Sequence, residues 1–170
     1  PMYYASRIAK QKYPNAKVVF IGPCIAKRKE AQRDECVDYV MTFEELHPLF
    51  KGLGIELEQA NPYKVAYESV CEAHGFAQAG GVAGAVKAYL GPKADGIKML
   101  QFSDFNKKNI GVLRAYAKTG KVDAQFIEMM ACEGGCVTGP SAHNDPVAGR
   151  RQLNQDLLKR TLKYENSNDK

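Results

Sequence analysis

Short apolar runs alternate along this chain with longer segments that carry apolar residues at helical spacing. Four such runs, rich in β-branched, aromatic and other apolar residues, occur at residues 17–21, 39–41, 97–102 and 126–131. Helical segments separate them, so the strands are joined by crossovers, which favour parallel pairing. The pattern predicts an α/β fold with a mostly parallel sheet of about four strands flanked by helices.

The predicted helices in the first half of the chain have recognisable ends. Residues 2–12 and 24–33 form two of them, on either side of the first strand. Thr42 and Glu45 fit a capping box, which predicts a helix that runs to about residue 51.

Three further helices are predicted in the second half of the chain. One spans residues 80–90 between a glycine pair and a Gly-Pro. Ser103 is predicted to cap a helix that ends before Gly120. Asp145 is predicted to cap a last helix, with proline at its first position, that runs to about residue 163.

Composition indicates an ordinary soluble domain. The 170 residues are 45% hydrophobic and 25% charged, and we expect one domain over residues 1–164 with a flexible tail at 165–170. No apolar run spans a bilayer and no export pattern begins the chain, so a cytoplasmic location is expected. The net charge of +5 is spread along the sequence, which argues against nucleic-acid binding.

Cysteines carry the chemistry. The odd count of five, without export, favours buried thiols, metal ligands or redox cysteines over disulfides. Cys24 follows the first strand, and Cys132 and Cys136 follow the fourth, so these three thiols are expected on one sheet edge. Thiolates suit zinc, copper(I) or iron-sulfur clusters. Zinc sites usually need a second close pair, and the Gly-Gly between Cys132 and Cys136 lets backbone approach a cluster, so we favour iron-sulfur.

Several other residues have both a functional and an ordinary interpretation. Lys27 lies three residues after Cys24, and Glu30 could hold its ammonium, yet a solvated surface pair has the same spacing. Gly80 and Gly81 offer N–H groups to an anion, although a glycine pair is a weak signal. The remaining candidates are weaker: Cys36 and Cys71 are expected to be buried or free thiols, His47 structural, and His143 a possible site residue.

Two motifs resemble those of iron-only (FeFe) hydrogenases. Residues 21–31 match Pro-Cys-x-x-Lys-x-x-Glu, and residues 128–139 match Glu-x-Met-Ala-Cys-x-x-Gly-Cys-x-x-Gly. Residues 76–82, which begin with Phe76, resemble the Phe-Gly-x-Thr-Gly-Gly-Val loop beside the cluster, and residues 37–46 resemble a fourth family segment. The resemblance covers roughly residues 17–154.

The resemblance implies a role for each matched position. Cys24 and Cys132 would bind a 4Fe-4S cubane, and Cys136 would bridge it to a di-iron unit, together forming the H-cluster. Lys27 would contact a cyanide ligand and, with Cys136, belong to the catalytic centre. The cofactor-binding positions would be Cys24, Lys27, Glu30, Phe76, Gly80, Gly81, Cys132 and Cys136.

Departures from the family pattern narrow these expectations. The Thr-Ser-Cys-Cys-Pro motif that supplies the fourth ligand would lie upstream, so we expect the chain to be a fragment and, alone, to be inactive and to lack the cluster. Gly22, Ala77, Ala79 and Ala83 replace larger or different residues near the di-iron unit. These changes resemble the H2-sensing branch more than high-turnover enzymes.

The resemblance leaves three functions open. The parent would reversibly reduce protons to H2, as an enzyme or a sensor. Alternatively, it would be a non-catalytic hydrogenase-like iron-sulfur carrier or assembly protein, or a zinc-binding or interaction domain. Expected partners are an electron carrier such as ferredoxin, or fused iron-sulfur domains, together with cluster maturation proteins, but neither nucleic acid nor membrane.

Overall fold

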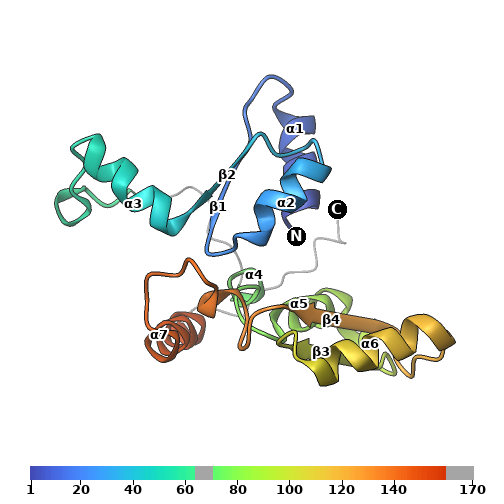
Figure 1. The fold of residues 1–170 in the computed structure, drawn as a ribbon. Helices are drawn as coiled ribbons and strands as arrows, with labels where there is room; N and C mark the ends of the chain where they lie inside the picture. The colour runs from blue at the N-terminus through green and yellow to red at the C-terminus, as the bar shows by residue number, and fades with distance from the viewer. Residues whose placement is uncertain (64–70, 160–170) are drawn as a thin grey trace. The chain divides into compact units, whose positions relative to one another are not determined.

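A computed structural model describes residues 1–63 and 71–159 (Figure 1). The chain divides into two compact units, described separately below. Unit 1 comprises Pro1–Lys64 and Gly139–His143, and unit 2 comprises Val65–Thr138 and Asn144–Lys170. The two units therefore alternate along the chain: Val65–Thr138 of unit 2 separates the two segments of unit 1, and Asn144–Lys170 of unit 2 follows them. The predicted tail and the end of the predicted last helix lie outside the described residues.

Unit 1 is built on one parallel strand pair. Its elements are α1 (Met2–Lys12), β1 (Val19–Gly22), α2 (Ala26–Arg33), β2 (Tyr39–Thr42), α3 (Phe43–Gly52) and the short 3-10 helix η1 (Leu57–Gln59). Val19 pairs with Tyr39 and Gly22 with Thr42, so both strands end at the same edge. The turn that carries Cys24 and the helix α3 both leave from that edge (Figure 1).

The start of α3 has the predicted capping box. The Thr42 hydroxyl accepts a hydrogen bond from Glu45 N, while the Glu45 carboxylate accepts one from Thr42 N at 2.8 Å. The bond from Thr42 N, together with those from the Arg28 guanidinium and the Thr42 hydroxyl, holds the pKa of Glu45 below its ordinary value. The strand-to-helix junction is therefore fixed by sequence-local hydrogen bonds.

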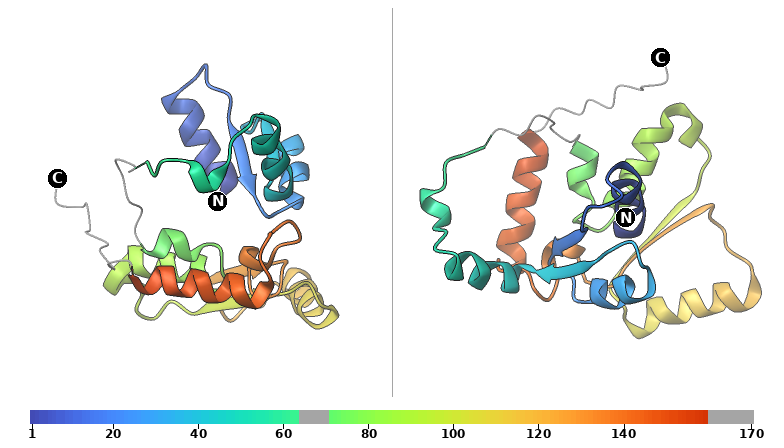
Figure 2. Two further views of the ribbon diagram at one scale, coloured as in Figure 1. Left: turned by 90° about the vertical axis from the view of Figure 1, so that its left-hand side faces the viewer. Right: turned by 90° about the horizontal axis from the view of Figure 1, so that it is seen from above.

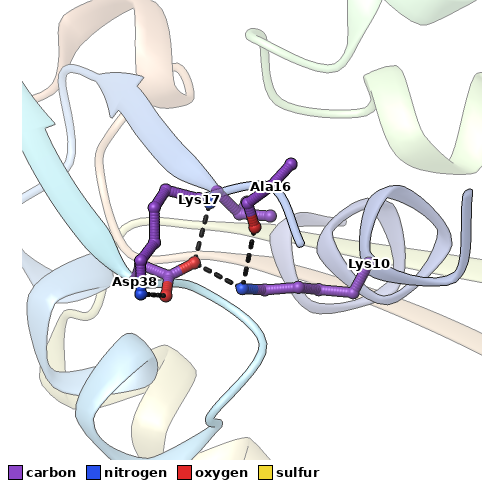
Figure 3. Close-up of polar contacts among 5 residues, drawn as sticks. Lys10, Ala16, Lys17 and Asp38 are labelled. Carbon is purple, nitrogen blue, oxygen red and sulfur yellow. Dashed lines mark hydrogen bonds and ion pairs between the residues drawn. The ribbon is translucent and has the colours of Figure 1, made fainter. Parts of the chain in front are cut away.

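Asp38 joins three segments at the other edge of this sheet (Figure 3). Its carboxylate lies 2.6 Å from Lys10 Nζ and 3.2 Å from Lys17 Nζ, and it accepts a 2.7 Å hydrogen bond from Val18 N. These donors, Lys10 first and Val18 N second, hold the pKa of Asp38 well below its usual range. Asp38 thus ties α1 to the beginnings of both strands.

Unit 2 repeats the strand-helix-strand arrangement. Its elements are α4 (Cys71–Gly75), α5 (Gly81–Leu90), η2 (Gly91–Ala94), β3 (Met99–Ser103), α6 (Lys107–Thr119), β4 (Phe126–Met130), η3 (Cys136–Thr138) and α7 (Pro146–Lys159). The two strands are parallel, with Met99 opposite Phe126 and Ser103 opposite Met130. Helix α4 packs against α5 and α7, as the views of Figure 2 allow the reader to follow.

The predicted α/β class and parallel pairing are confirmed, but within the described residues the strands form two sheets of two rather than one of about four. Each crossover, through α2 or through α6, pairs only the strands that it connects. Apolar content identifies strands and does not identify their neighbours, which is why the sequence suggested one sheet.

Helix caps were predicted with mixed success. Asp145 caps α7, since its Oδ1 accepts hydrogen bonds from Val147 N and Ala148 N. Helix α6 ends before Gly120, as predicted, and Gly120 has the left-handed conformation. The prediction for Ser103 is wrong: Asn106 is the N-cap of α6, accepting a 2.9 Å hydrogen bond from Asn109 N. No helix in the described part of the chain is long and apolar enough to cross a membrane.

Candidate metal centre

The turn that carries Cys24 is short and local. Strand β1 ends at Gly22, and the half-buried Cys24 precedes α2. Lys27 N lies 3.4 Å from the Cys24 carbonyl, which closes the turn into the helix. The carbonyl of Pro23 accepts a 3.2 Å hydrogen bond from Ser141 N. Residue 24 is therefore fixed by its own helix and by the Gly139–His143 segment of the same unit.

Lys27 forms an ion pair with Glu30, one helical turn further along α2. Their side chains are 24% and 22% exposed, whereas those of the nearby pair Arg28 and Glu45 are 49% and 47% exposed. Lys29 donates a 3.3 Å hydrogen bond to Gln32 at an exposed position. Among the consecutive basic residues Lys27, Arg28 and Lys29, Lys27 is thus distinguished by its partial burial. An ammonium has three N–H groups, of which Glu30 uses one.

The loop between Cys132 and Cys136 follows the end of β4. Gly135 N donates to the Cys132 carbonyl at 3.1 Å, which closes the loop on itself. Ser103, at the end of the neighbouring strand, accepts a 2.8 Å hydrogen bond from Gly134 N and donates to the Cys132 carbonyl at 3.4 Å. Ser103 thus connects the loop to the end of β3, a role that the sequence analysis did not predict.

The segment before α5 lies directly against this loop. Ala79 N donates to the Gly134 carbonyl at 3.1 Å, and Val137 N donates to the Ala77 carbonyl at 2.8 Å. Gly135 has φ +104°, and a Cβ there would lie 2.6 Å from backbone atoms of Gln78 and Ala79. Only glycine fits this contact, because any side chain would collide with backbone.

Glu128 organises the start of α5 from within strand β4. Its carboxylate is 5% exposed and accepts hydrogen bonds from Gly80 N at 2.9 Å and Ala83 N at 2.8 Å. Gly81 N donates to the Gln78 carbonyl at 3.1 Å. The N–H groups of Gly80 and Gly81 therefore have partners within the protein. Because these residues have no side chains, a bound group could still approach their backbone closely.

Glu128 was also missed as a positioning residue. The signal was present in the sequence, since one carboxylate interrupts the otherwise apolar strand Phe-Ile-Glu-Met-Met. A buried carboxylate requires hydrogen-bond donors, and a glycine-rich helix start supplies them.

The remaining candidates lie in varied surroundings. Phe76 is half-buried directly after α4. His143 Nε2 lies 2.8 Å from the Phe43 carbonyl, and the His143 ring is 5.9 Å from that of His47. His143 therefore connects the Gly139–His143 segment to α3 of the same unit. Cys36 is a free, half-buried thiol.

The predicted ligands come from both units. Cys132 and Cys136 share one loop of unit 2, whereas Cys24 belongs to unit 1. Each follows the carboxyl end of a parallel strand, but the two strands belong to different sheets, which corrects the prediction of one shared sheet edge. Across residues 1–63 and 71–159, the structure shows no group of three or more His, Cys, Asp or Glu side chains able to hold a metal ion. Convergence of the three thiols stays a prediction.

Fold and site together define a class of protein: an α/β protein that presents cysteine thiols just beyond the carboxyl ends of parallel strands. A family model described as the iron only hydrogenase large subunit, C-terminal domain, matches residues 1–140. The chain therefore belongs to this family.

Solved structures show the same fold. A structure of HydA(deltaEFG), described in terms of stepwise FeFe-hydrogenase H-cluster assembly, matches 92% of the chain with 18% identity and a TM-score of 0.56. An FeFe-hydrogenase described for oxygen inactivation through degradation of the 2Fe subcluster matches 92%, with 20% identity and a TM-score of 0.54. A variant of apo FeFe-hydrogenase HydA1 from Chlamydomonas reinhardtii matches 97%, with 18% identity and a TM-score of 0.57. The chain covers 57%, 57% and 60% of these three chains.

Proposed function

We propose that this chain supplies part of the H-cluster site of an iron-only hydrogenase or H2 sensor. The observation that carries the proposal is the Cys132–Cys136 loop, whose glycine backbone is held between Ser103 and the segment before α5. Such a loop presents two thiols on hydrogen-bonded backbone, with only Glu133 and two glycines between them. Family membership supplies the chemical context.

The donor set fits an iron-sulfur group. Thiolates are the ligands that iron-sulfur clusters take, and both loop cysteines are half-buried. Cys24 and Cys132 would hold the cubane, and Cys136 would bridge to the di-iron unit. When bound, the H-cluster supplies the chemistry that interconverts protons, electrons and H2. A cubane takes four ligands, so the fourth comes from another part of the parent.

The other residues orient and shape the site. Glu30 restrains the Lys27 ammonium, so that its remaining N–H groups are available to an anionic ligand. Glu128 fixes the start of α5 and with it the segment that contacts Gly135. The small residues Ala77 and Ala79 at this contact favour the sensory branch over high-turnover enzymes.

The proposal extends to the parent protein. It exchanges electrons with a ferredoxin-like carrier or fused iron-sulfur domains, receives its cluster from maturation proteins and works in the cytoplasm.

Maturation of the full-length parent tests this function. Iron and acid-labile sulfide should be present, infrared spectra should show bands of bound carbon monoxide and cyanide, and an assay should detect H2 uptake or evolution. Iron and sulfide without these bands would favour the non-catalytic carrier, and a protein without either after maturation would overturn the proposal.

Lys27 and Lys29 provide a matched pair within this site. In the parent, Lys27→Ala should lower cluster incorporation more than Lys29→Ala, because Lys27 is the partly buried one paired with Glu30. Iron content per protein after maturation is the measurement. Equal losses in the two variants would assign Lys27 to the solvated helix face.

A further inference from the structure

Helix α7 packs directly on the cysteine loop of unit 2. A Cβ at the buried Gly149 would lie 3.6 Å from both Val137 Cγ2 and the Val137 carbonyl oxygen. Val137 immediately follows Cys136. The close approach of helix and loop fixes the position of the next residue of the helix, Arg150.

Arg150 lies over the glycine backbone between the two cysteines. Its Cδ and Nη1 atoms are both 3.4 Å, and its Cζ 3.5 Å, from the position of a Cβ on Gly134. The guanidinium and the end of its aliphatic stem therefore contact the middle of the loop. Asp145, by capping the first turn of α7, sets the helical register that places Arg150 there.

A cation at this position changes the electrostatics of whatever the loop binds. Thiolate ligands and a reduced iron-sulfur cluster carry negative charge, and reduction adds one more. A nearby positive charge stabilises the more negative, reduced form. The other charged group of the loop, Glu133, is exposed and of opposite sign, so its effect opposes that of Arg150.

We propose that Arg150 raises the reduction potential of the iron-sulfur group held by Cys132 and Cys136. Arg150 acts through the loop and its field, as a positioning residue and not as a ligand. This inference rests on the proposed function, since it requires a cluster at this loop. Because Arg150 is exposed, its effect is partly screened by solvent and decreases with salt.

Redox titration of the full-length, cluster-containing parent tests the inference. Relative to wild type, Arg150→Gln should lower the equilibrium constant for one-electron reduction about threefold, which is a shift of roughly 28 mV to more negative potential at 59 mV per tenfold. Arg150→Lys should restore at least half of the shift. Arg151→Gln, the adjacent exposed arginine, should give less than a third of it. The difference between wild type and Arg150→Gln should shrink in 0.5 M salt.

The outcomes separate this inference from the proposed function. No cluster in wild type overturns both. A cluster in wild type, with equal potentials in wild type and Arg150→Gln or equal shifts in Arg150→Gln and Arg151→Gln, overturns the inference alone.

A cluster-free variant is also informative. If Arg150→Gln loses the cluster, Arg150→Met takes its place in the titration, and a shift to more negative potential that Arg150→Lys reverses supports the inference. If both Arg150→Gln and Arg150→Lys lose it while Arg150→Met, which keeps an unbranched apolar stem, retains the wild-type potential, Arg150 serves packing alone and the inference is overturned.

Discussion

The two cysteine-bearing segments are held in contrasting ways. The turn at Cys24 depends on its own helix and on one hydrogen bond between Pro23 and Ser141. The loop from Cys132 to Cys136 is held by residues from a neighbouring strand and from the segment before α5, both distant in sequence, and by α7, which follows it closely. We therefore expect the turn at Cys24 to tolerate substitutions nearby. The loop from Cys132 to Cys136 should lose its conformation when a substitution prevents any one of its contacts.

The largest effect should follow from a side chain at Gly135. Gly135→Ala places a Cβ 2.6 Å from the backbone of Gln78 and Ala79, at φ +104°. Strain and overpacking together should cost roughly 3 to 5 kcal/mol in the free energy of unfolding. Urea unfolding followed by circular dichroism is the measurement.

Gly84→Ala is the matched control within the same unit. Gly84 lies inside α5 with nothing within 4 Å of a Cβ, so alanine there should stabilise the helix by about 0.5 to 1 kcal/mol. Similar destabilisation by the two variants would mean that Gly135 is not uniquely constrained.

A smaller loss is expected at Glu128. Glu128→Ala leaves the buried N–H groups of Gly80 and Ala83 without their acceptor, which should cost roughly 3 kcal/mol. Glu128→Gln keeps one acceptor oxygen and should cost less. Glu133→Gln, at an exposed position of the cysteine loop, should leave the unfolding midpoint unchanged. If Glu128→Ala matches Glu133→Gln, then Glu128 does not organise α5.

Unit 1 should respond more weakly to a comparable change. Thr42→Ala removes one hydrogen bond of the capping box and should cost about 1 kcal/mol. Thr42→Ser retains the hydroxyl and should lie near wild type. A loss as large as that at Gly135 would erase the contrast between local and distant support.

The contribution of Asp38 to stability is tested through its dependence on pH. Its pKa is lower in the folded chain than in the unfolded chain, where about 3.9 is ordinary. The stabilisation is therefore complete above the unfolded pKa and disappears as pH falls through the folded pKa. The free energy of unfolding of wild type should fall progressively below about pH 4, and in Asp38→Asn it should depend less on pH. An unchanged pH profile in Asp38→Asn would assign the acid sensitivity to other carboxylates.

Much of the fold could be predicted because its signals are local. Helix α1 has the predicted bounds, and the capping box at Thr42 and the glycine that ends α6 depend on residues within one turn of each other. Strand partners were harder, since pairing depends on contacts between segments far apart in sequence. The five-residue α4 was missed because it is too short to show helical periodicity.

The same distinction between local and distant contacts applies to the candidate site. The ion pair of Lys27 and Glu30 follows from their spacing on one helix, and the structure shows it. The support from Ser103 and Glu128 could not be predicted, because the groups they contact are 29 to 48 residues away. Serine is a common N-cap residue, so the sequence alone favoured Ser103 as the cap of α6. The structure shows that Asn106 is the cap.

The separation of the two segments of unit 1 by Val65–Thr138 has a consequence for biosynthesis. Residues 1–63 leave the ribosome well before Gly139–His143, the segment that donates to Pro23 and contacts Phe43. At about 5 to 20 residues per second, translation of the intervening residues takes roughly 4 to 15 s. During that interval residues 1–63 lack the Gly139–His143 segment that contacts them. The turn beside Cys24 gains its hydrogen bond from Ser141 only after both Cys132 and Cys136 have been synthesised.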